Sequence, residues 1–138
     1  QVELEHSVFT NLPDYHRFLT VLDGRLELQI GSAPRAVLSP WTVCEFDGRT
    51  PVESWGRCTD LNLMLRKGAC TGAMEVLRLS AGQSSLVQPD WDILGLYCVQ
   101  GGVSWLKCGQ FGLLREATAF HLEPAEDSVF LAMKTRLL

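Results

Sequence analysis

Alternating apolar and polar residues mark several segments of the chain as β-strands. Every second residue of 26–30 is leucine or isoleucine, and every second residue of 61–65 is leucine. This alternation places one set of side chains on each face of a pleated strand. Residues 128–134 read as a similar strand, and residues 71–79 fit a strand about as well as a helix, so we favour a strand there. The pattern predicts an all-β protein.

A dipeptide suited to a tight turn divides the first of these regions. Asp23-Gly24 lies between two apolar-rich runs, and Asp-Gly readily adopts the positive φ angles of a hairpin turn. A looser copy covers residues 96–106, with Val99 in the place of Leu22 and Gly101 in the place of Gly24. A leucine and a short aromatic strand follow each copy, at residues 43–46 and 118–121. We therefore predict two hairpins and one β-module that is used twice.

The repeat and the regular turn residues indicate a specific architecture. The segment 21–24, the alternation after it and Leu38-Ser39-Pro40 are similar to the central part of a cupin module. We predict a cupin-like double-stranded β-helix, or jelly roll, with two intertwined cupin-like halves, a bicupin. Residues 80–92 are the best connector, so the halves are 1–79 and 80–138, packed as one compact unit. An unrelated β-sandwich with an accidental repeat is the alternative.

Composition narrows the classes of function. The 138 residues are 46% hydrophobic and 20% charged, which is typical of a globular protein and argues against disorder. The net charge is −4 and lysine and arginine do not cluster, which argues against nucleic-acid binding. No apolar run approaches the roughly 20 residues that span a bilayer, and the first residues do not resemble a signal peptide. We expect a cytoplasmic protein.

The five cysteines fit the same compartment. Their number is odd and no pair has the Cys-x-x-Cys spacing of a zinc or redox site. We interpret all five as reduced thiols. A catalytic thiol is the alternative, but no cysteine has an obvious basic partner in the sequence.

Cupin enzymes usually contain a metal ion, which is bound by a His-x-His pair, a glutamate and a third histidine. By this resemblance the glutamate stands seven residues before the hairpin glycine, where this chain has Arg17 and, in the second copy, Leu94. The three histidines, His6, His16 and His121, match no metal motif. A metal site assembled from all three is the alternative. The sequence therefore predicts no metal and no cofactor.

An arginine in place of the glutamate suggests another use of the interior. If Arg17 points inward, its buried cation requires a carboxylate partner or an anionic ligand. The polar face of the 60–66 strand would supply further groups that line the pocket, namely Asp60, Asn62, Met64 and Arg66. The structural alternative is an internal salt bridge of Arg17 with Asp60, with Arg66 ending its strand in solvent.

Residues 6–24, 46–52 and 60–66 carry a resemblance to a known family. Their Phe-Thr start, the turn ending in arginine, Leu-Thr-Val-Leu-x-Gly and Asp-x-Asn-x-Met-x-Arg are similar to the HutD/Ves family. The last motif is the most specific. The resemblance implies a cupin-like fold, and it carries Arg17 and the four polar-face residues over as pocket residues. Asp14 and His16 depart from the family pattern, and we keep His16 as a candidate ligand-binding residue.

The resemblance also implies a function. HutD members are encoded with bacterial histidine-utilisation enzymes and are thought to restrain that pathway by binding an intermediate such as urocanate or a formylated amino acid; Ves members are linked to stress responses. We therefore expect a metal-free binding protein for a small carboxylate, with a regulatory role and no catalytic residue. Members of the family also begin upstream of Gln1, which implies a further N-terminal strand.

Two other functions stay open at this point. One is an enzyme of isomerase, lyase or hydrolase type that uses His16 or Asp60 as an acid or base. The other is a module that acts on a partner protein through a sheet face. Free sheet edges are also compatible with a homodimer.

Overall fold

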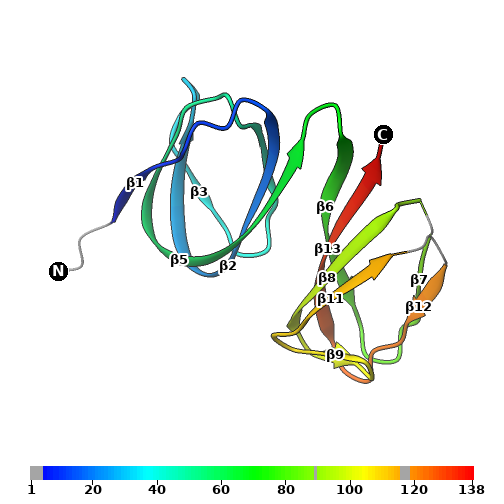
Figure 1. Ribbon diagram of the computed structural model, residues 1–138. Helices are drawn as coiled ribbons and strands as arrows, with labels where there is room; N and C mark the ends of the chain where they lie inside the picture. Colours follow the sequence, from blue (N-terminus) through cyan, green and yellow to red (C-terminus); the bar gives the residue numbers. More distant parts are fainter. Residues whose placement is uncertain (1–4, 89, 116–118) are drawn as a thin grey trace. The chain divides into compact units, whose positions relative to one another are not determined.

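All regular structure in the described residues is β-strand (Figure 1). The computed structural model describes residues 5–88, 90–115 and 119–138. The all-β prediction is confirmed. No helix in this part of the chain is long and apolar enough to cross a membrane. The strands form two compact units, residues 1–67 and 68–138.

The division between the units falls earlier than the boundary expected after residue 79. The strand β6 (Cys70–Leu79) pairs along its whole length with β13 (Ser128–Leu137), and it is therefore part of the second unit. This strand also decides the ambiguous segment 71–79 in favour of a strand. The expected connector, 80–92, contains a strand of the second unit, β7 (Ser85–Val87).

The first unit is a sheet built around two long strands. It consists of β1 (His6–Val8), β2 (Tyr15–Ile30), β3 (Ala36–Leu38), β4 (Cys44–Asp47) and β5 (Val52–Arg66). Its sheet order is β1-β5-β2-β3, with β4 also paired to β2. The two halves of β2 lie on opposite sides of the unit in Figure 1, and β3 and β4 pair with different halves.

The hairpin predicted at Asp23-Gly24 is wrong. The residues before and after this dipeptide belong to the single strand β2, and both halves pair with β5. The register shifts between Val21 and Asp23, so Leu22 is an extra residue in a β-bulge. Gly24 follows the bulge with φ +92°. The positive φ was inferred correctly, but it serves a bulge and not a turn.

The second unit repeats the sheet order of the first. Its main sheet has the order β6-β13-β8-β11, so that in both units the first strand pairs with the last and the last pairs with the strand that carries the bulge. Two short pairs complete the unit, β9 with β10 and β7 with β12. The remaining strands are β8 (Ile93–Gln100), β9 (Gly102–Val103), β10 (Leu106–Lys107), β11 (Phe111–Arg115) and β12 (Phe120–Leu122).

At the position of the predicted second hairpin turn, the structure again has a β-bulge. The register of β8 against β13 skips Val99, and Gly101 follows with φ +71°. The tight turn comes later, at Ser104-Trp105 between β9 and β10. The sequence equivalence of Val99 with Leu22 and of Gly101 with Gly24 is therefore present in the structure. The aromatic strand expected at 118–121 is observed as β12, with residue 118 outside the described residues.

Each unit has its own hydrophobic core. In both cores, the inward residues of the bulged strand meet those of its neighbours. The core of the first unit consists of Leu19, Val21, Leu26, Leu28, Leu38, Phe46 and Val52. The core of the second unit consists of Leu79, Val87, Trp91, Leu94, Leu96, Cys98, Val103, Leu106, Leu122, Phe130 and Ala132.

Candidate functional site

Arg17 points into the first unit, in the direction that the cupin resemblance implied. Its neighbours on the same face of β2 are Leu19 and Val21, which are fully buried members of the core. Only 6% of Arg17 is exposed to solvent. Because a cation in such surroundings loses its hydration, its remaining interactions decide what it can do.

Two aromatic rings and two distant oxygens surround the guanidinium. Its carbon atom Cζ lies 5.2 Å from the ring centroids of both Phe9 and Phe46. Nη1 donates to the carbonyl oxygen of Thr10 and Nη2 to Oδ1 of Asn62, each at 3.5 Å. These bonds exceed the usual 2.7–3.2 Å range. The buried Nε has no hydrogen-bond partner. The guanidinium is held by cation–π contacts and is short of acceptors.

The charge of Arg17 is only partly balanced. Burial lowers the pKa of Arg17, and the nearby carboxylate of Asp60 opposes this effect. An arginine stays protonated in proteins, so the group remains cationic at neutral pH. Among the described residues no ion pair within 4.0 Å joins Arg17 to Asp60. The internal salt bridge that was the alternative is therefore not formed.

The predicted polar face of β5 lies beside Arg17. The register places Met64 directly opposite Arg17 and Asn62 opposite Leu19. Directly paired residues of antiparallel strands project to the same side of the sheet. The alternation predicted for 60–66 is confirmed: the three leucines are more buried than the polar-face residues, which are exposed. The residues on that face are Asp60, Asn62, Met64 and Arg66.

His16 lies apart from this group. It is adjacent to Arg17 on β2 and therefore projects to the opposite face of the strand. Its Nε2 lies 2.6 Å from Oε1 of Glu45, and its ring meets that of Phe18 edge-on at 5.1 Å. His16 and Asp60, the two acid or base candidates, therefore project to opposite faces of the sheet. His16 also does not line the surroundings of Arg17.

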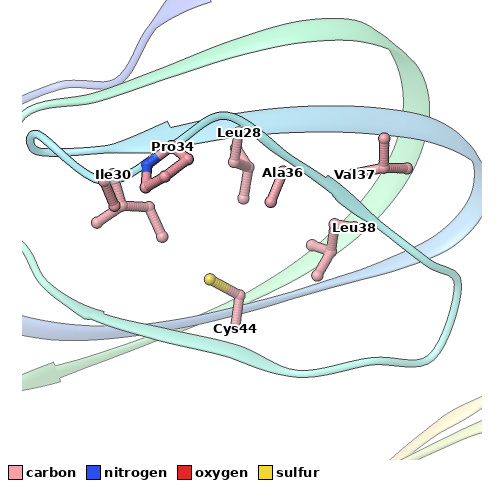
Figure 2. A pocket seen from close by; sticks show the side chains of 8 residues that line it. Leu28, Ile30, Pro34, Ala36, Val37, Leu38 and Cys44 are labelled. Atoms are coloured by element: carbon pink, nitrogen blue, oxygen red, sulfur yellow. The ribbon is translucent and has the colours of Figure 1, made fainter.

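A second feature of the first unit is an apolar cavity of about 200 Å³. Figure 2 shows the Cys44 sulfur directed toward Leu28 and Ile30 across this cavity. Burial raises the pKa of the Cys44 thiol, which keeps it neutral. The lining residues are Leu28, Ile30, Ala33, Pro34, Ala36, Val37, Leu38 and Cys44. None of them is a predicted site residue.

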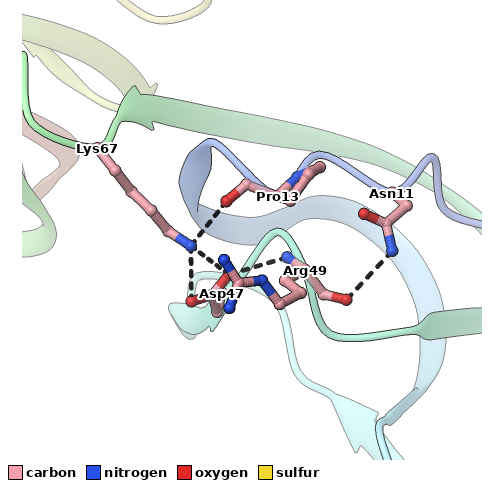
Figure 3. A network of polar contacts seen from close by, with 5 residues as sticks. All are labelled: Asn11, Pro13, Asp47, Arg49 and Lys67. Atoms are coloured by element: carbon pink, nitrogen blue, oxygen red, sulfur yellow. Dashed lines mark hydrogen bonds and ion pairs between the residues drawn. The ribbon is translucent and has the colours of Figure 1, made fainter.

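A polar clasp fixes the loop that covers Arg17 (Figure 3). Nζ of Lys67 donates to both carboxylate oxygens of Asp47, at 2.7 and 2.8 Å, and to the carbonyl oxygen of Pro13 at 2.8 Å. The backbone N–H of Arg49 donates to Asp47 at 2.9 Å, and the Asn11 side chain donates to the Arg49 carbonyl at 3.2 Å. The clasp joins the loop before β2 to the turn after β4.

The clasp is expected to make stability depend on pH in the acid range. The hydrogen bond from Lys67, followed by that from the Arg49 N–H, holds the pKa of Asp47 below its ordinary value of 3.8. A lowered carboxyl pKa stabilises the fold above the ordinary value, and this contribution is lost as the pH falls through the folded-state pKa. Asp47→Asn should lower the free energy of unfolding at pH 7.

Urea unfolding of both proteins between pH 7 and pH 2 checks this prediction. The difference between the wild type and Asp47→Asn should shrink below pH 3.8. Asp14→Asn is the control, because the Asp14 backbone carbonyl, and not its carboxylate, accepts the bond from the Lys67 N–H. A constant difference at all pH values would contradict the role of the Asp47 charge.

The other chemistry-bearing residues stay dispersed. In the described residues no three His, Cys, Asp or Glu side chains are grouped so that they could hold a metal ion. None of the five cysteines, all of which lie in the described part of the chain, forms a disulfide. Nε2 of His6 lies 3.0 Å from the carboxylate of Glu53, and the His6 ring stacks on Trp55.

Sequence reasoning missed several groups that touch Arg17 or hold its surroundings. Phe9 and Phe46 both lie in segments that carry the family resemblance, so a signal for them was present. The Thr10 carbonyl is a backbone group and leaves no signal in the residue type. The Lys67–Asp47 pair joins residues far apart in sequence, which only the fold brings together.

Comparisons with known proteins agree with the resemblance. A family model described as HutD matches residues 2–137. Among solved structures, a conserved protein of unknown function from Pseudomonas aeruginosa PAO1, PA5104, is 21% identical with a TM-score of 0.80; the match covers 98% of this chain and 79% of that one. No curated protein matches the chain.

Two further structures share the fold. A HutD from Pseudomonas fluorescens SBW25, determined in a formate condition, is 17% identical with a TM-score of 0.72, covering 96% of this chain and 75% of that one. YhaK from Escherichia coli is 14% identical with a TM-score of 0.56, covering 99% of this chain and 83% of that one.

Proposed function

The chain belongs to the HutD family, and from this membership and the surroundings of Arg17 we propose that its first unit binds the carboxylate of a small molecule. The observation that carries the proposal is a buried guanidinium short of acceptors. Nε has no partner, and both terminal nitrogens make bonds of only 3.5 Å. A carboxylate would give this fork two short, charge-assisted hydrogen bonds.

The neighbours of Arg17 suit such a ligand. The Phe9 and Phe46 rings hold the guanidinium in place without neutralising it. Asn62 offers an amide at the exposed side of the site, and the Asp60 carboxylate on the same strand could accept a hydrogen bond from an N–H group of the ligand. Urocanate and a formylated amino acid both combine a carboxylate with such a donor.

The physiological part of the proposal follows from the family. Binding without turnover suits a regulatory protein, acting in histidine utilisation or in a stress response. The proposal assigns no catalytic residue. The shared sheet order and the paired bulges support the view that the two units are two cupin-like halves.

The proposal is tested by titrating the protein with formate and acetate. The Arg17 Nε–H resonance should shift and saturate in ¹⁵N NMR spectra of the wild type. Arg17→Met should abolish this binding, and Arg17→Lys should weaken it at least about tenfold because it loses the planar fork. Arg57→Met is the matched control, since Arg57 is exposed and pairs with Glu5.

Stability measurements separate loss of binding from loss of fold. Removal of a poorly satisfied buried cation in favour of an apolar side chain is neutral or stabilising in many proteins. Arg17→Met should therefore unfold at the same or a higher temperature than the ligand-free wild type. Unchanged acetate affinity in a folded Arg17→Met protein would refute the proposed function.

A further inference from the structure

The apolar cavity lies in a gap of the first unit. The strands β3 and β4 pair with opposite halves of β2 and leave the cavity between them. Leu28 and Ile30 form its inner wall, whereas Ala33 and Ala36 are exposed at its rim. A molecule can therefore enter from solvent between the two short strands.

Size and chemistry define what the cavity accepts. Its volume of about 200 Å³ exceeds the roughly 150 Å³ of an apolar cavity that takes up benzene. The Cys44 thiol is the one side chain of the lining that is not hydrocarbon, and burial keeps it neutral. The side chains of the lining therefore offer a charged group no counter-charge, and the cavity suits an uncharged apolar group.

The cavity and Arg17 are neighbours along β4. Phe46 is paired with Arg17 in the register and touches its guanidinium, and Cys44 is two residues earlier on the same face. Two residues of one strand that share a face lie about 7 Å apart. Phe46, Leu28 and Leu38 also belong to one hydrophobic cluster, against which Cys44 and Ile30 pack. The aromatic contact of the cation and part of the cavity lining thus belong to one hydrophobic cluster.

We infer that the carboxylate ligand of Arg17 carries an uncharged apolar body, which binds in the cavity between β3 and β4. The inference rests on the proposed function and specifies its ligand class: a carboxylate that carries a short aliphatic chain or a single ring. A ligand that consists of the carboxylate alone would leave the cavity unused.

Three probes separate the two parts of the ligand. Acetate carries the acid group, hexan-1-ol the apolar chain, and hexanoate both. For the wild type, hexanoate should bind at least about tenfold more tightly than acetate, because burial of two methylene groups corresponds to about tenfold in affinity. Titrations followed by calorimetry and by the methyl resonances of Leu28, Ile30 and Leu38 measure this difference.

Two variants locate the chain of hexanoate. Ala36→Phe fills the cavity from its exposed rim and should remove the advantage of hexanoate while acetate still binds. Ala33→Phe is a second filling variant in case the first is unstable. Val8→Phe, at an exposed position of β1 outside the lining, should keep the advantage.

The outcomes distinguish the inference from the proposed function. Equal affinity for acetate and hexanoate, or an advantage that survives both filling variants, overturns the inference and leaves carboxylate binding at Arg17 standing. A third result also overturns it: hexan-1-ol binds in the cavity, but hexanoate binds the protein no more tightly than acetate does. The cavity and the carboxylate site would then be separate. Acetate that binds equally to Arg17→Met overturns the proposed function.

Discussion

Replacing Gly24 with alanine is expected to lower the free energy of unfolding by about 3 kcal/mol or more. Gly24 has φ +92°, and a Cβ atom at this position would lie 2.4 Å from the carbonyl oxygen of Arg57 and 2.8 Å from Cα of Cys58. Both are backbone atoms of β5, and neither can move without breaking the pairing of the two long strands. Chemical unfolding followed by circular dichroism measures the loss.

Gly68→Ala is the matched control for this change. Gly68 also has a positive φ, +80°, but nothing lies within 4 Å of a Cβ built there. Its substitution should cost about 1 kcal/mol, the penalty of the backbone conformation alone. If Gly24→Ala cost no more than Gly68→Ala, the close packing of the bulge against β5 would not be a source of stability.

Introducing an arginine at Leu94 is expected to cost about 3–5 kcal/mol. Leu94 stands seven residues before Gly101, as Arg17 does before Gly24, and it is fully buried in the core of the second unit. The cluster around it consists of apolar side chains and one thiol. An arginine there would bury a cation without the aromatic and polar contacts that Arg17 has.

Leu94→Met is the conservative control, and a volume-conserving exchange of this kind costs less than about 1.5 kcal/mol. Thermal and urea unfolding of both variants measure the contrast. If Leu94→Arg were as stable as Leu94→Met, the second unit would tolerate a cation at this position. This result would contradict the view that the contacts of Arg17 in the first unit are needed to bury a cation at this position.

The sequence predicted the features that depend on local pattern. The leucines of 61–65 identified the faces of β5, because alternation is a property of one strand. The inward direction of Arg17 was implied by the cupin resemblance, in which the residue seven before the glycine points inward, and Arg17 is buried as that resemblance implies. The polar face of residues 60–66 followed from the alternation of that strand.

Features that depend on pairing between distant parts of the chain could not be predicted from the sequence. A glycine with positive φ fits a turn and a bulge equally well, and only the partner strand β5 decides between them. The apolar cavity depends on the gap between β3 and β4, which no local pattern encodes. His16 became a candidate through its position in the family motif, which does not show that adjacent strand residues face opposite ways.

The bulge at Leu22 also sets the parity of the long strand. Before it the odd-numbered residues of β2 face the core, as Arg17 and Leu19 do, and after it the even-numbered residues Leu26 and Leu28 face the core. The single extra residue changes which set of residues faces inward, so that both halves of β2 line the same interior. The partner strand β5 has no extra residue, and its alternation continues unchanged. Val99 does the same in the second unit, where even-numbered Leu96 and Cys98 give way to odd-numbered Val103. The bulge five residues after Arg17 therefore lets Arg17 and the second half of the same strand face one interior.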